Sequence, residues 1–113
     1  MSMIWQSEKP VVRSTEQSSL PSVDGLSLLN NHAHLLVCLL RNNKQTLRNV
    51  AEQIGITERA AQRIVAELES LGILERTKVG RRNQYTINTN VRLTNAVENG
   101  LTIGDILAPF ASQ

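Results

Sequence analysis

The feature of this 113-residue sequence that most restricts its fold is a pair of amphipathic helical stripes separated by a short turn. Four apolar residues of the first stripe recur with the spacing of one helix face: Leu47, Val50, Ala51 and Ile54. Gly55 is suited to the left-handed conformation that ends a helix. Thr57 is suited to cap the next helix, because its hydroxyl can accept from free backbone amides. The sequence therefore predicts two helices whose relative angle is set by the turn.

The second of these helices, expected from about Glu58 to Leu71 and closed by Gly72, divides into two faces. One face is apolar and consists of Ala61, Ile64, Val65, Leu68 and Leu71. The opposite face carries Arg59, Gln62, Arg63 and Ala66. Arg and Gln side chains form paired hydrogen bonds with the edges of guanine and adenine, and a small alanine allows close approach to a groove. The exposed face is therefore suited to contact with a double helix.

A helix is predicted before this pair and a hairpin after it. The apolar stripe of Leu35, Leu36, Leu39 and Leu40 indicates a buried helix over 31–42, capped by Asn30 or Asn31. Residues 73–78 and 83–87 alternate as two short strands around Val79-Gly80-Arg81-Arg82. We expect a hairpin with a cationic tip, in which Tyr85 faces the helices.

The two ends of the chain differ from this centre. Residues 1–27 are rich in Ser, Gln and Glu and have no sustained period, so we expect a flexible tail. In the segment 90–113, four apolar residues suggest a helical stretch broken at Gly100: Val91, Leu93, Ala96 and Val97. Thr102 and Asp105 then form a capping box before a short helix that we expect to stop at Pro109. The apolar residues of this segment exceed what a small core needs, which predicts that it forms a homodimer interface: Val91, Leu93, Ile103, Ile106, Leu107 and Phe110.

Composition excludes several classes of function. The net charge is only +2, but residues 41–82 hold nine Lys and Arg against five Glu, a local excess of +4, which favours a polyanionic partner. With only Trp5, Tyr85 and Phe110 as aromatic residues, there are too few rings for the stacking platforms of single-strand binders. No apolar run is long enough for a membrane helix or a secretory signal, so we expect a cytoplasmic protein with no membrane partner.

The sequence predicts neither a metal nor another cofactor. One Cys and two His cannot supply a four-ligand zinc site, and His32 and His34 point to different faces of their helix. Cys38 is expected to fill the core. We find no nucleophile with a paired base and no glycine-rich phosphate loop, so no catalytic residue is proposed and an enzyme is not expected.

Together these elements predict a mainly α fold with a small β-hairpin wing, the winged helix-turn-helix, over residues 28–89. In that fold the recognition helix, 57–71, enters the major groove of double-stranded DNA. The wing, 76–85, contacts the backbone or the minor groove. The expected DNA-binding residues are Thr57, Arg59, Gln62, Arg63, Lys78, Arg81, Arg82 and Asn83.

Two strings carry a resemblance to a known family: GITERAAQRIVAELE, from Gly55 to Glu69, and VGRRNQY, from Val79 to Tyr85. This chain resembles the small MarR/ArsR-like winged-helix regulators of prokaryotes over roughly residues 30–88. The resemblance implies a homodimer on a semi-palindromic operator, with Arg59, Gln62, Arg63, Arg81, Arg82 and Asn83 at DNA-facing positions. The chain departs from the family's pattern after Thr89, and the ArsR-type cysteine metal motif is missing.

Two alternatives remain beside this interpretation. An arginine on an exposed helix face is usually only a solvated charge. The same fold also serves as a protein-protein interaction module without DNA binding. A protein-binding face would be apolar or acidic, whereas this face carries Arg59, Gln62 and Arg63, which favours DNA.

Overall fold

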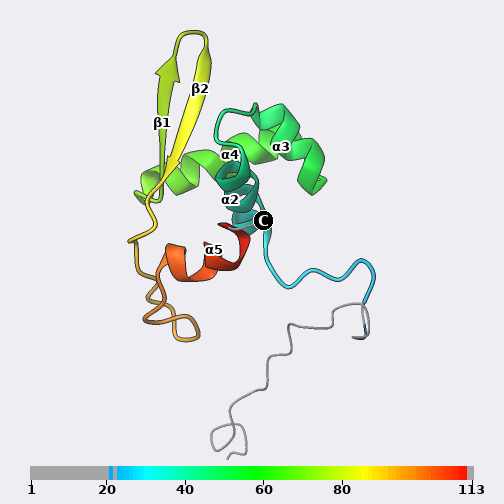
Figure 1. The fold of residues 1–113 in the computed structure, drawn as a ribbon, viewed down its shortest axis with the longest axis vertical. Coiled ribbons are helices and arrows are strands. Elements are labelled where there is room, and N and C mark those ends of the chain that lie inside the picture. The colour runs from blue at the N-terminus through cyan, green and yellow to red at the C-terminus, as the bar shows by residue number, and fades with distance from the viewer. Residues whose placement is uncertain (1–20, 22, 112–113) are drawn as a thin grey trace, which may run out of the picture.

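The computed structural model describes residues 21 and 23–111. Along the chain these form α2 (Asn31–Arg41), α3 (Leu47–Ile54), α4 (Glu58–Ser70), β1 (Leu74–Val79), β2 (Arg82–Ile87) and α5 (Ile103–Ala111). The hairpin β1–β2 projects from one end of the helical body, and α5 lies at the opposite end, beyond α2 (Figure 1). The predicted fold class, mainly α with a small β wing, is confirmed. Most of the predicted flexible tail, 1–27, lies outside the described residues.

Local capping explains where the central helices begin and end. The side chain of Asn30 accepts a hydrogen bond from the backbone amide of Ala33 at 3.0 Å, and that of Thr57 accepts from Ala60, also at 3.0 Å. Both caps satisfy amides that have no partner inside the helix. Gly55 ends α3 at φ 80°, the left-handed conformation that favours glycine. The predicted caps and the turn before α4 are confirmed.

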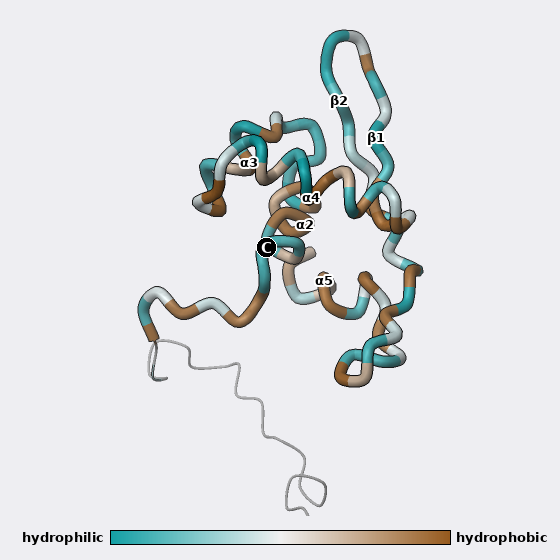
Figure 2. The backbone as a smooth tube through the Cα atoms, turned by 180° about the vertical axis from the view of Figure 1, so that it is seen from behind, coloured by the Kyte–Doolittle hydropathy of each residue, from teal (hydrophilic) through white to brown (hydrophobic). Residues whose placement is uncertain are grey.

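The core forms around α2. Leu35, Leu39, Val50 and Val65 are the largest fully buried side chains, and they come from α2, α3 and α4. In Figure 2 the hydrophobic colouring gathers on α2 and α5, whereas the hairpin is mostly hydrophilic. Cys38 belongs to this core, as predicted. Burial raises the pKa of its thiol, more than the guanidinium of Arg41 lowers it.

The hairpin is antiparallel, with Leu74 opposite Ile87 and Val79 opposite Arg82. Pairing continues one residue further toward the tip than the expected strands 73–78 and 83–87, so the connection has only two residues, Gly80 and Arg81. Gly80 has φ 64°, and glycine at the first position of a two-residue turn matches the twist of the strands. Arg81 and Arg82 are therefore at the end of the hairpin, as predicted.

The helical stretch predicted around Val91, Leu93, Ala96 and Val97 is wrong. Residues 95–100 form a bend and turns, and the segment is closed by an isolated bridge between Arg92 and Thr102. The side chain of Asn95 accepts from the backbone amides of Val97 at 3.0 Å and Glu98 at 2.8 Å. Such local side-chain hydrogen bonds compete with those of a helix.

Two further helix predictions need correction. The sequence places Leu71 on the apolar stripe of α4, but Leu71 is 61% exposed. The helix ends at Ser70, one residue earlier. Gly72, at φ 77°, then turns the chain, so that Ile73 and Leu74 are buried instead. Pro109 does not stop α5, which continues to Ala111. Phe110 packs against the core beyond the proline and holds the last turn in place.

The capping box of α5 is confirmed, and it orients the helix toward the core. The backbone amide of Asp105 donates to the Thr102 hydroxyl at 3.0 Å, and that of Thr102 donates to the Asp105 carboxylate at 2.9 Å. Ile103 and Leu107 are 6% and 3% exposed within the core cluster, and Val91, Leu93 and Phe110 pack against that cluster. The apolar residues that suggested a dimer interface are therefore largely used within one protomer, and the homodimer stays a prediction. No helix in the described part of the chain is long and apolar enough to cross a membrane.

Candidate nucleic-acid interface

The exposed face of α4 is the first part of the candidate interface. Arg59, Gln62, Arg63 and Ala66 are all exposed, while Ala61, Ile64, Val65 and Leu68 are buried. The division predicted from the sequence is thus confirmed for every residue of the helix except Leu71. Glu58 stands at the start of α4 and is the acidic residue of its first turn.

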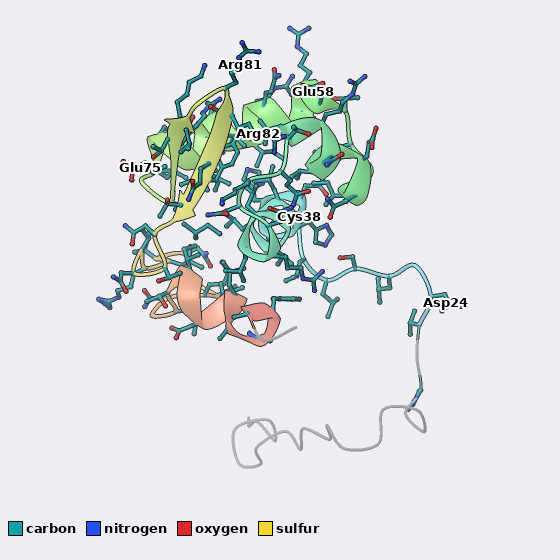
Figure 3. The ribbon with its side chains drawn as sticks, turned by 45° about the horizontal axis from the view of Figure 1, so that its top comes forward. Asp24, Cys38, Glu58, Glu75, Arg81 and Arg82 are labelled. Carbon is teal, nitrogen blue, oxygen red and sulfur yellow. The ribbon has the colours of Figure 1, made fainter. Side chains whose placement is uncertain are left out.

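The second part is a cleft of about 970 Å³ between the hairpin and the helices. Arg81, Arg82 and Asn83 line it from the hairpin, Gln62 lines it from α4, and Lys44 lines it from the loop before α3. Arg81, at the outer end of the hairpin, and Glu58, at the start of α4, lie toward the same end of the molecule in Figure 3. The cleft is therefore open on the side where the cationic tip and the recognition helix both face solvent.

The structure separates the predicted site residues into two groups. Gln62, Arg81, Arg82 and Asn83 line the cleft together. The others are exposed but do not line it: Thr57, Arg59, Arg63 and Lys78. Their placement on α4, its cap and β1 extends the polar surface beyond the cleft on either side.

Two of these side chains also have structural contacts. The hydroxyl of Thr57 accepts the capping hydrogen bond from the backbone amide of Ala60. Asn83, which is half-buried, hydrogen-bonds the side chain of Tyr85 and is therefore anchored within the wing.

Sequence reasoning missed the cleft residues contributed by the loop before α3. Lys44, Gln45 and Thr46 of this loop line the cleft, together with Asn49 in the first turn of α3. Gln45 is fixed there, because its side-chain amide donates to the carbonyl of Cys38 at 2.8 Å. The sequence does carry a signal for Lys44 and Thr46, because a lysine and a capping threonine directly before a helix are typical of a surface that attracts phosphate.

The wing is attached to the helical body near its base. Tyr85 is 2% exposed, and its backbone amide donates to the carbonyl of Asn43 at 3.0 Å, which confirms that it is wing core. Burial raises the pKa of Tyr85, against smaller lowering effects from the Arg76 guanidinium and the Asn83 hydrogen bond. Arg76, opposite Tyr85 in the ladder, forms an ion pair with Glu69 of α4 at 2.9 Å.

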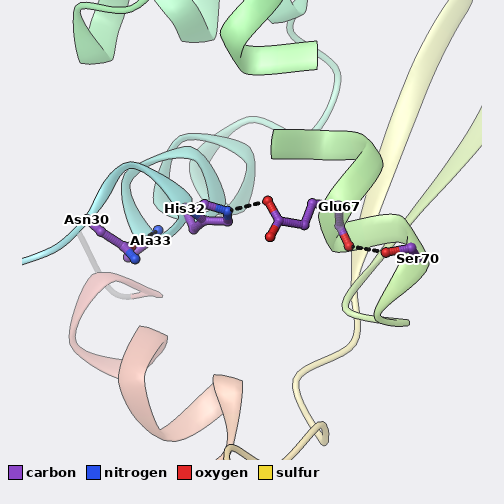
Figure 4. Close-up of polar contacts among 5 residues, drawn as sticks. All are labelled: Asn30, His32, Ala33, Glu67 and Ser70. Carbon is purple, nitrogen blue, oxygen red and sulfur yellow. Dashed lines mark hydrogen bonds and ion pairs between the residues drawn. The ribbon is translucent and has the colours of Figure 1, made fainter. Parts of the chain in front are cut away.

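The recognition helix is also held from its other side. His32 of α2 hydrogen-bonds the Glu67 carboxylate, with 2.9 Å between Nε2 and Oε1 (Figure 4). Since an ionised carboxylate can only accept, Nε2 carries the proton in this contact. The carbonyl of Glu67 in turn accepts from the Ser70 hydroxyl at 2.7 Å. Glu67 thus connects the first helix of the core to the last turn of α4.

This arrangement of three helices, a turn and a hairpin defines a class of protein. Residues 29–75 match the family model described as winged helix-turn-helix DNA-binding. The match begins just before α2 and ends in β1, so it covers the helical part and a little under half of the 113 residues. With the hairpin that the structure adds, this part of the chain has the winged helix-turn-helix fold.

The solved structures to which part of this chain is similar include two of ZitR from Lactococcus lactis. A point mutant of ZitR is 17% identical, with a TM-score of 0.47, over 60% of this chain and 48% of its own. Wild-type ZitR in complex with DNA is 14% identical, with a TM-score of 0.44, over 74% of this chain and 55% of its own. The present chain therefore spans about half the length of these proteins. Among curated proteins, no match was found.

Proposed function

We propose that this protein is a sequence-specific regulator of transcription that binds double-stranded DNA and performs no chemistry of its own. The observation that supports this most is the cleft, which combines Gln62 of the recognition helix with Arg81 and Arg82 of the wing. Gln62 is suited to contact base edges in a groove, and the two arginines are suited to neutralise phosphates. Because the structure holds their elements in a fixed relation, the three side chains suit a DNA duplex.

In this proposal α4 enters the major groove. Arg59, Gln62 and Arg63 contact base edges, and Ala66 allows the helix to approach closely. Arg81, Arg82 and Lys78 neutralise the neighbouring backbone or enter a narrow minor groove. Lys44, on the opposite wall of the cleft, adds a phosphate contact that extends the expected set. Thr57 and Asn83 contribute at the ends of the two elements.

The experiment that tests this function is a fluorescence-anisotropy titration against duplex and single-stranded DNA across a range of salt concentrations. We expect micromolar binding to random duplex that weakens steeply as salt rises, and weaker binding to single strands, because phosphate contacts release counterions. Arg92→Ala is a matched control, since Arg92 is exposed but pairs with Thr102 at the far end from the wing. Absence of duplex binding at low salt would move the assignment to a protein-protein interaction module.

The finer assignment, to MarR/ArsR-like regulators acting as homodimers in the cytoplasm, belongs to the same proposal. A single module of this size covers too little surface for tight specific binding, so two copies on two half-sites are the natural solution. Large apolar side chains remain exposed near α5 and in the turns of residues 95–100: Leu28 at 91%, Leu71 at 61% and Val97 at 92%. These offer a dimer surface in place of the residues that the core uses.

Sedimentation velocity without DNA tests the dimer. Leu71→Glu and Val97→Glu are expected to shift the protein toward the monomer, because a charge would have to be buried in the interface. Val79→Glu is the matched control, since Val79 is 56% exposed but lies in the wing. A wild-type protein that sediments as a monomer at all concentrations contradicts the homodimer.

A further inference from the structure

The wing has few contacts that fix its direction. In β1 only Leu74 is buried, and the five following residues are exposed. In β2 only Tyr85 is buried. The outer part of the hairpin is therefore not supported by packing, and its direction depends on what holds its base.

A two-point contact holds that base to the recognition helix. The Nε of Arg76 donates to Oε2 of Glu69 at 3.1 Å, and its Nη2 donates to Oε1 of the same carboxylate at 2.9 Å. Arg76 is the third residue of β1, and Glu69 lies in the last turn of α4. Paired parallel hydrogen bonds of this kind fix an orientation as well as a distance. The hydrogen bond to Glu69 is also the main reason why the pKa of Arg76 is raised.

We propose that Glu69 and Arg76 are positioning residues, which set the angle between the wing and the recognition helix and so determine where Arg81 and Arg82 meet the DNA. This inference rests on the proposed function. The pair spans the Leu71–Ile73 connection, the only covalent link between α4 and the hairpin.

The length of the hairpin amplifies small changes at this contact. From Arg76 to the turn the strand extends about 13 Å, at roughly 3.3 Å per residue, so a rotation of about 15° moves the tip by roughly 3 Å. That displacement equals the length of a hydrogen bond. The pair is partly exposed, with 39% and 30% of the two side chains accessible, so it adds little to stability, and its effect is on geometry.

Two substitutions separate this role from a simple charge effect. Glu69→Gln removes an acidic group near the DNA, so electrostatics alone would tighten binding. The positioning role predicts instead that binding to a selected duplex weakens, by roughly three- to tenfold. Arg76→Lys keeps the charge but loses the two-point contact, and we expect the same weakening. Glu75→Gln, which removes the same charge at an exposed residue next to Arg76 in β1, is the matched control.

The decisive comparison repeats both substitutions in a protein that already carries Arg81→Ala and Arg82→Ala. Because the pair acts through the wing arginines, its loss is expected to change affinity less than twofold in that background. Equal losses in both backgrounds, or tighter binding by Glu69→Gln with the wing intact, would overturn the proposal.

A measurement without DNA distinguishes this proposal from the proposed function. In ¹H–¹⁵N NMR spectra, the Nε–H signal of Arg76 is expected to be protected from exchange with water and to lose that protection in Glu69→Gln. Relaxation of the amides of residues 78–82 should then report larger motion, and Glu75→Gln should change neither. Unchanged wing relaxation in Glu69→Gln would refute the positioning role even if the protein binds DNA. If the wild-type protein binds no duplex, the proposed function fails, whereas the NMR result still decides whether the pair holds the wing.

Discussion

Three arginines show that the neighbours of a side chain determine the role that it can have. Arg63 is exposed on α4, Arg82 lines the cleft from the wing, and Arg76 is occupied by Glu69. A guanidinium held by a carboxylate has fewer donors left for phosphate, whereas an exposed one on a recognition helix has all five. The same residue type is therefore proposed to read bases, neutralise phosphates and orient the wing.

Arg63 and Arg82 should behave differently when each is replaced by alanine. Arg63→Ala is expected to cost about 1 to 3 kcal/mol of binding and to relax specificity at one base pair, because it removes a base contact. Arg82→Ala should weaken all sequences alike and reduce the salt slope by about 1, because it removes a phosphate contact. Affinities for a selected duplex and its single-base variants, measured at several salt concentrations, check both. Uniform loss with both variants would mean that neither side chain reads bases.

The ionisation of Tyr85 should be linked to folding. Burial raises its pKa in the folded protein, so its contribution to stability is fully present below the unfolded value, about 10, and is lost as pH rises through the folded value. Because Tyr85 is the one tyrosine, absorbance at 295 nm follows it alone. We expect the titration to lie above that of free tyrosine and to coincide with alkaline unfolding followed by circular dichroism. A titration midpoint near 10 in a still-folded protein would contradict this.

At the scale of helices and strands, the most predictable features were those with local causes. Thr57, Gly55 and Asn30 act on amides or dihedral angles within a few residues, so their roles follow from the sequence alone. The two arginines at the hairpin tip follow from the position of Gly80 between alternating strands. The amphipathic division of α4 is similarly local, because helix periodicity sets it.

The features that sequence reasoning missed depend on contacts between distant residues. Leu71 has the spacing of a core residue but faces solvent, because the chain turns toward β1. The pairing of Arg76 with Glu69 requires the angle of the hairpin to be known. Val91 and Leu93 have helical spacing, yet they pack on the core from an irregular segment.

Removal of the Thr57 cap tests the contribution of the turn to α4. Thr57→Ala is expected to lower the free energy of unfolding by about 1 kcal/mol, because the amide of Ala60 loses its partner. Thr94→Ala, in the exposed segment before α5, serves as the control and should change stability by less than about 0.5 kcal/mol. Urea denaturation of the three proteins gives the comparison, and equal stability of all three would show that the cap contributes nothing.

For the molecule as a whole, α2 is the element on which the others assemble. It contacts α3, α4, α5 and β2, and five consecutive residues of it are buried: Leu35, Leu36, Val37, Cys38 and Leu39. The helices that present the interface and the helix at the far end therefore share one core. A substitution in α5 should consequently lower the free energy of unfolding of the whole domain.

Leu107→Ala tests this shared core. Leu107 is 3% exposed, and we expect the substitution to cost about 2 to 5 kcal/mol in the free energy of unfolding, since it leaves a cavity against α2. Leu28→Ala is the matched control, because Leu28 is 91% exposed, and it should have little effect. Thermal denaturation reports both, and a Leu107→Ala protein as stable as the wild type would mean that α5 is not part of the cooperative unit.

The position of α5 also has a consequence during biosynthesis. Ile103 and Leu107 cover α2, so this helix, the first among the described residues, lacks part of its cover until α5 has been translated. A translation product that ends before α5 would leave apolar surface of α2 facing water, a condition that favours aggregation or capture by chaperones. Copies that lack α5 should therefore be removed by quality control before they accumulate.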